Sequence, residues 1–95
     1  MPILQIQHAT RDFDAWKQSF DSDPVGREQG GVRNYRILRG TDDPNYVVIE
    51  LEFDSTGEAE AFGGKLRELW GRVGDELGLE GPQARVLDSV ETGEH

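Results

Sequence analysis

The amino-acid sequence predicts an α+β domain in which two helices cover one face of a four-stranded antiparallel sheet. Four segments alternate between apolar and polar residues or contain short apolar runs, as strands do, and two segments repeat apolar residues every three or four positions, as helices do. Turn residues separate these segments. In chain order they read β-α-β-β-α-β, the split βαβ or ferredoxin-like arrangement. We expect one small domain, residues 1–95, with a flexible tail at residues 91–95.

The first strand and the first helix are predicted to bring a histidine close to aromatic residues. Residues 2–8 alternate in polarity, which places His8 on the same strand face as Leu4 and Ile6. Asp12 is suited to cap the following helix, because its carboxylate can accept a hydrogen bond from a free backbone N–H. The apolar stripe of that helix consists of Phe13, Trp16 and Phe20. We therefore expect His8 to face the helices.

The remaining strands are expected at residues 32–39, 46–53 and 83–90. Residues 40–45 contain Gly, Asp, Pro and Asn, which indicates a tight turn between the first two of them. In the strand at 46–53, the helix-facing side would carry Val47, Ile49, Leu51 and Phe53.

Two glutamates on the same strand would point away from the helices. Glu50 and Glu52 alternate with the apolar residues, so they would lie inside a barrel if a second sheet covered this face. An unpaired buried carboxylate is costly to keep ionised. We therefore expect arginines of the sheet, such as Arg33 or Arg85, to compensate these charges.

The second helix is expected to start at a capping box, in which Ser55 and Glu58 satisfy free N–H groups. The pair Gly63-Gly64 would interrupt it, because each glycine costs about 1 kcal/mol against Ala in a helix interior. Gly78 and Gly81-Pro82 would end it. Its apolar stripe consists of Ala59, Phe62, Leu66, Leu69, Trp70, Val73 and Leu77.

The composition excludes several classes of function. The formal net charge of −9 argues against binding to nucleic acid and to anionic membrane surfaces. The sequence has no cysteine and two histidines, which excludes thiolate metal centres, disulfides and histidine-rich metal sites. The acidic residues are spread out, and no glycine-rich phosphate-binding motif is present, so we expect no metal and no cofactor. Without a visible signal peptide or membrane span, we expect a cytoplasmic protein.

Three segments resemble small bacterial members of the dimeric α+β barrel superfamily. They are residues 13–24, the turn Asp42-Asp43-Pro44-Asn45 with the strand after it, and residues 58–62. This superfamily contains antibiotic biosynthesis monooxygenase-like domains, some polyketide cyclases and many proteins of unknown function. The resemblance implies a homodimer whose two sheets pack face to face. It also implies a pocket for a small apolar or aromatic molecule between each sheet and its helices.

Candidate site residues follow from the faces of the strands and helices. His8 or Tyr35 could transfer a proton, and Arg27 could hold an anionic oxygen. A flat apolar ligand would be held by Trp16, Phe20, Phe62 and Trp70. In the alternative interpretation these aromatic residues form an ordinary core, His8 is a hydrogen-bonded structural residue, and Arg27 forms a salt bridge.

Three functions remain open at this point. The chain is a cofactor-independent oxygenase or cyclase acting on an aromatic or polyketide-like molecule, or a non-catalytic dimer that binds a small molecule, or a structural accessory protein without a ligand. A cavity of roughly 300 Å³ or more with His8 in its wall would favour the first two. A filled space between helices and sheet would favour the third.

Overall fold

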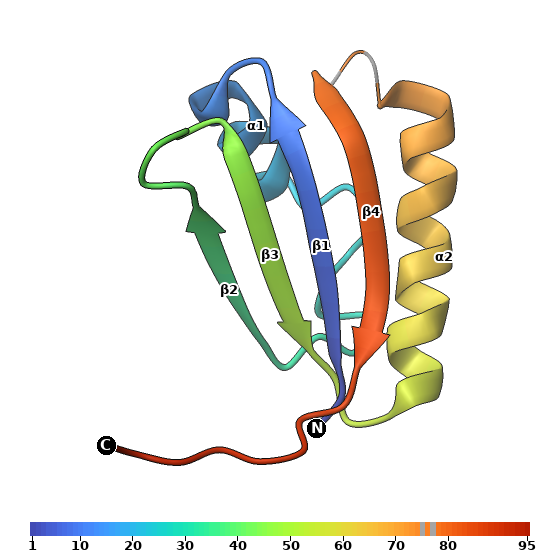
Figure 1. Ribbon diagram of the computed structural model, residues 1–95. Helices are drawn as coiled ribbons and strands as arrows, with labels where there is room; N and C mark the ends of the chain where they lie inside the picture. Colours follow the sequence, from blue (N-terminus) through green and yellow to red (C-terminus); the bar gives the residue numbers. More distant parts are fainter. Residues whose placement is uncertain (75, 77) are drawn as a thin grey trace.

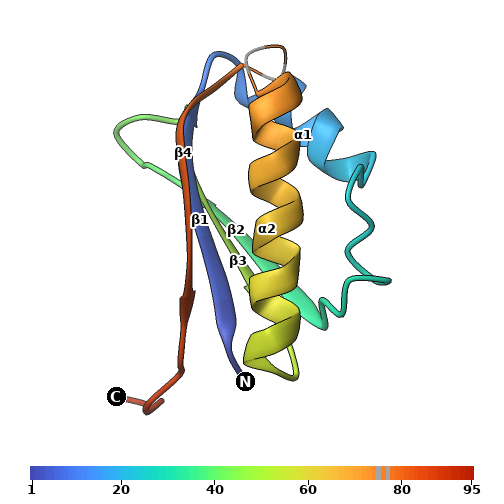
Figure 2. The same ribbon diagram turned by 90° about the vertical axis from the view of Figure 1, so that its right-hand side faces the viewer.

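The computed structural model describes residues 1–74, 76 and 78–95, and it has the predicted order of elements (Figure 1). The elements are β1 (Ile3–Thr10), α1 (Phe13–Asp21), β2 (Asn34–Arg39), β3 (Tyr46–Glu52), α2 (Thr56–Val73) and β4 (Leu79–Leu87). The strands form one antiparallel sheet in the order β2-β3-β1-β4. Both helices lie on one side of this sheet, and its other side is open (Figure 2). The ferredoxin-like α+β prediction is therefore confirmed.

The core lies between the sheet and the two helices. β1 buries every second residue, and β3 does the same. The helices contribute Trp16 from α1, and Ala59 and Phe62 from α2. The buried apolar residues of the strands are Leu4, Ile6, Val47, Ile49, Leu51 and Leu79, with Phe53 directly after β3. The predicted alternation of β1 and β3 is thus confirmed, and His8 is buried on this helix-facing side.

α2 is one continuous helix, so the prediction that Gly63-Gly64 would interrupt it is wrong. Ser55 caps the helix, and its side chain accepts a hydrogen bond from the backbone N–H of Glu58 at 3.1 Å. Gly63 is buried, and a Cβ there would lie 3.4 Å from Cδ1 of Leu4, an ordinary van der Waals distance. The contact between α2 and β1 would therefore accept a methyl group at this position. Leu77, the last residue of the predicted stripe, lies outside the described residues.

β4 begins four residues earlier than predicted, because Gly81-Pro82 lies inside this strand and does not end the helix. Gln7 of β1 pairs with Gln83, whereas Ala9 pairs with Glu80. Two residues of β4 therefore stand opposite one residue of β1, which is His8. Gly81 has a φ of +58°, the left-handed conformation that the first residue of a common bulge type requires. A bulge also tolerates proline, which cannot donate to the ladder.

The charges of the sheet pair differently from the prediction. Glu50 lies on the open face as expected, but Arg36 binds it, with Nε donating to a carboxylate oxygen at 3.0 Å. Arg36 stands directly opposite Glu50 in the β2–β3 register. Arg33 instead pairs with Asp54, at 2.6 Å between Nη2 and the carboxylate, and this interaction raises the pKa of Arg33. The expectation that an arginine of the sheet compensates Glu50 is therefore confirmed, but the arginine is Arg36 and not Arg33 or Arg85.

No helix in the described part of the chain is both long and apolar enough to cross a membrane. Beyond β4, residues 88–95 form no regular element, so the last strand stops before the predicted residue 90.

Candidate functional site: a hollow between sheet and helices

A hollow of about 80 Å³ lies between the sheet, the two helices and the segment that connects α1 to β2. Most of its wall is apolar and comes from the core, including Ile6, Ile49 and Leu51. Pro24, in the connecting segment, is exposed and belongs to the rim. Six of the seven candidate residues line this hollow, namely His8, Trp16, Phe20, Arg27, Phe62 and Trp70.

The His8 side chain is 4% exposed and has a defined hydrogen bond. Its Nδ1 lies 3.2 Å from the backbone oxygen of Ala9. A carbonyl oxygen only accepts hydrogen bonds, so Nδ1 carries the proton and Nε2 carries the lone pair of the neutral ring. Nε2 is the ring nitrogen farther from the backbone, and no group of the described residues bonds to it.

Burial also fixes the charge of this histidine. Removal from water lowers the pKa of His8 below the usual 6.5, and the hydrogen bond to Ala9 opposes this effect only in part. The ring packs edge-on against Trp16, with 5.4 Å between centroids. At neutral pH, His8 is therefore uncharged, and its Nε2 can accept a hydrogen bond or a proton inside an apolar wall.

Aromatic rings continue from His8 along α1 towards β2. Trp16 and Phe20 are 5.4 Å apart, and Phe20 and Tyr35 are also 5.4 Å apart. The spacing of the helix residues places them on one face, as the sequence predicted. Tyr35 stands outside the lining of the hollow and is 53% exposed, so the row of rings leads from a buried base to the surface.

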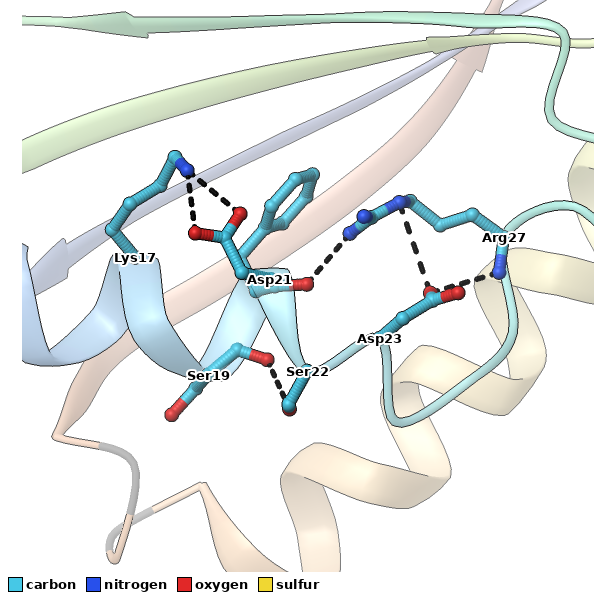
Figure 3. A network of polar contacts seen from close by, with 7 residues as sticks. Lys17, Ser19, Asp21, Ser22, Asp23 and Arg27 are labelled. Atoms are coloured by element: carbon cyan, nitrogen blue, oxygen red, sulfur yellow. Dashed lines mark hydrogen bonds and ion pairs between the residues drawn. The ribbon is translucent and has the colours of Figure 1, made fainter.

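Arg27 ties the connecting segment to the end of α1 (Figure 3). Its guanidinium carbon lies 3.8 Å from the centre of the Phe20 ring and 5.2 Å from that of Tyr35. Nη1 donates to the backbone oxygen of Phe20 at 2.7 Å, and Nε lies 3.7 Å from the carboxylate of Asp23. The same carboxylate accepts the backbone N–H of Arg27 at 2.9 Å. Arg27 thus stacks on the aromatic row and fixes the segment beside the hollow.

Two glycines seat the connecting segment on α2. A Cβ on Gly30 would lie 2.5 Å from Cδ2 of Phe62. Gly31 has a φ of +95°, and a side chain there would collide with the carboxylate of Glu58. The backbone of the segment therefore touches α2 directly. The sequence gives no sign of this contact, since only the packing shows which surface a bare glycine faces.

Sequence reasoning also missed two polar residues of the wall, Ser19 and Asp23. The only available signal for Ser19 is its position beside Phe20 on α1, and Asp23 carries no signal of its own in the sequence. Within the described residues, no three His, Asp or Glu side chains are placed to hold a metal ion. The site therefore consists of one buried imidazole, an aromatic and aliphatic wall, and polar groups from α1 and the segment after it.

No protein-family model and no curated protein matches this chain. It is similar to solved structures of an antibiotic biosynthesis monooxygenase, at 13% identity over 96% of this chain and 100% of the other, with a TM-score of 0.67. It is also similar to SnoaB, a cofactor-independent oxygenase from Streptomyces nogalater, at 12% identity over 96% of this chain and 94% of the other, with a TM-score of 0.72. A dimeric ferredoxin-like protein from an uncultured marine organism is 11% identical over 97% of each chain, with a TM-score of 0.64. At these identities the comparisons establish the fold alone, which this chain shares with the three solved structures.

Proposed function

We propose that this chain is a homodimeric, cofactor-independent monooxygenase- or cyclase-like enzyme that acts on an aromatic or polyketide-like small molecule in the hollow. The observation that carries the proposal is the unpartnered Nε2 of His8, a neutral base in an apolar wall. The similarity in fold to a cofactor-independent oxygenase supports the same chemistry.

His8 would act as the general base. A phenol or enol bound in the hollow would donate its proton to Nε2, because this atom is the free acceptor of a neutral imidazole. The product of this transfer is an electron-rich phenolate or enolate. Such an anion can reduce O₂ directly, as in an oxygenase, or attack an electrophilic carbon, as in a cyclase.

Arg27 and Tyr35 would serve the outer part of the substrate. Arg27 is a permanent cation beside the hollow and would attract an anionic oxygen, although two of its nitrogens already face Phe20 and Asp23. Tyr35 lies at the surface end of the aromatic row, where its hydroxyl would exchange a proton with a substrate that reaches the rim.

The homodimer would form through the open face of the sheet. Leu38 and Tyr46 are 40% and 41% exposed there, next to the half-buried Val48. Tyr46 donates to the side chain of Gln7 at 3.1 Å, so the polar groups of this face are already partly satisfied within the chain. A dimer of standard size buries about 800 Å² on each partner, which a four-stranded face can supply.

A non-catalytic small-molecule carrier is the second candidate, because the same wall could bind a ligand without converting it. The volume of the hollow, about 80 Å³, is well below the roughly 300 Å³ at which ligand pockets usually begin, and it favours instead a structural accessory protein without a ligand. Binding without turnover would make the protein a carrier or sensor.

The test combines turnover and binding in the wild type and in His8→Phe. Phenolic and enolic compounds are added to the protein, and O₂ uptake and product formation are followed by electrode and mass spectrometry. The enzyme proposal requires turnover that His8→Phe loses while light scattering still gives a dimer. Binding with no product from any compound would contradict catalysis and support the carrier.

A further inference from the structure

We propose that the hollow selects a single-ring phenol, or an enol of similar size, whose O–H donates to Nε2 of His8, and that it rejects fused multi-ring molecules. This inference rests on the proposed function and narrows its substrate class. It follows from three properties of the hollow. They are its volume, the Nε2 of His8 that has no donor among the described residues, and the closely packed ring of Phe62 in its wall.

The volume limits the part of a ligand that the hollow can enclose. An apolar cavity of about 150 Å³ lined by Leu, Ile and Phe is large enough for benzene. The hollow here holds about 80 Å³, so one six-membered ring fits only if half-buried side chains give way slightly. Leu66 and Trp70 of α2 are such half-buried residues in its wall. A second fused ring would require about twice that space.

The polar groups of the wall determine which functional group is recognised. Asp23 and Arg27 already bind each other and the backbone of their own segment. Among the described residues, no group donates to Nε2 of His8, whereas the fully buried side-chain oxygen without a partner is Oγ1 of Thr10, outside this wall. A ligand O–H gives Nε2 a hydrogen bond in an apolar wall, and an otherwise identical ether cannot give it. The nearby guanidinium of Arg27 disfavours a cationic donor such as an ammonium group.

One side of the hollow has no room to move outwards. Phe62 is 3% exposed and packs on Phe53, with 5.6 Å between the ring centroids. The backbone of Gly30 also lies against this ring, so closely that a Cβ would collide with it. The Phe62 ring is therefore held by contacts with both Phe53 and Gly30. A single ring can bind after a small movement of other side chains in the wall. A fused ring system would also require the Phe62 ring to move outwards, which its contacts oppose.

The experiment compares three probes on the intact protein. They are 4-methylphenol, its methyl ether, and 1-naphthol, and binding is measured by ligand-observed NMR and by fluorescence of the two tryptophans in the wall, Trp16 and Trp70. We expect the phenol to bind at least about tenfold more tightly than the ether, the fold-change that a difference of 1.4 kcal/mol produces. We expect 1-naphthol to bind more weakly than 4-methylphenol.

Two variants identify the acceptor. His8→Phe keeps a ring beside Trp16 and removes Nε2, so the preference for phenol over ether should fall to about one. Ser19→Ala, a matched change at another polar residue of the wall, should leave the preference unchanged. Circular dichroism and light scattering verify that both variants fold.

The outcomes separate this inference from the proposed function. Equal binding of phenol and ether to the wild type overturns the inference, as does tighter binding of 1-naphthol or a preference that Ser19→Ala abolishes. If a fused-ring compound is oxidised with O₂ in a reaction that needs His8, the size limit fails and the enzyme proposal stands. If the phenol binds through His8 but no compound is turned over, the size limit stands and the enzyme proposal fails. Absence of binding by all three probes overturns the inference.

Discussion

Replacing Gly64 by alanine should stabilise the protein, because this glycine serves no packing purpose in the structure. It lies inside the continuous helix α2, is exposed, and has no atom within 4 Å of the position that a Cβ would take. The full difference in helix propensity should therefore appear as a gain of about 1 kcal/mol in the free energy of unfolding. For a domain of this length, 1 kcal/mol corresponds to a rise of about 5 °C in Tm. Gly71→Ala has an equally open environment two turns later, and the double variant should gain about twice as much.

The measurement is thermal unfolding followed by circular dichroism, at one fixed protein concentration because the proposed dimerisation would make Tm depend on concentration. Gly63→Ala is the matched comparison, since its Cβ would meet Leu4 in the core at 3.4 Å, an ordinary van der Waals distance. We expect Gly63→Ala to gain at least as much as Gly64→Ala, because the added methyl group is also buried. An unchanged or lower Tm for Gly64→Ala would refute the reasoning, because it would mean that the glycine pair does break the helix.

Three further predictions concern the site and the open face. The free energy of unfolding should fall as the pH is lowered through about 6.5, because His8 takes up a proton in the unfolded chain but stays neutral in the folded chain, where burial lowers its pKa. Urea unfolding at several pH values should show this dependence in the wild type and its loss in His8→Phe. Gly30→Ala should cost about 1–3 kcal/mol in urea unfolding, because the new Cβ forces the Phe62 ring aside, and a neutral result would mean that the segment does not rest on α2. Arg36→Glu places a second carboxylate beside Glu50 on the open face and should shift light scattering towards the monomer; an unaltered dimer would place the interface elsewhere.

The parts of the fold that follow from local chemistry could be predicted from the sequence. Alternation of polarity placed His8 on the helix-facing side of β1, and the cap residues Asp12 and Ser55 marked the starts of both helices. The side chain of Asp12 accepts a hydrogen bond from the N–H of Asp14 at 3.0 Å, as an N-cap should. Such signals depend on neighbouring residues, so they can be seen without a structure.

Features that depend on distant partners could not be predicted. The pairing of Glu50 with Arg36 follows from the register of β2 against β3, which one sequence does not specify. The pair Gly63-Gly64 is unfavourable by helix propensity, yet α2 continues through it, because the packing of a helix against the rest of the fold outweighs such a cost. The contact between Gly30 and Phe62 likewise joins residues that lie far apart in the chain.

The bulge in β4 depends both on its local sequence and on the strand opposite it, and it lies at the candidate site. Locally, Gly81-Pro82 has the composition of a chain stop, yet the strand continues through it because the bulge accommodates a left-handed glycine and a proline without an N–H. Both residues stand opposite His8, so β4 is irregular at the one position where β1 carries a buried base. Bulges concentrate beside active sites because they redirect the strand at a chosen residue. A purely structural histidine in a filled core would need neither this irregularity nor a hollow beside its ring, and the coincidence of both at His8 is the reason to search for its ligand first.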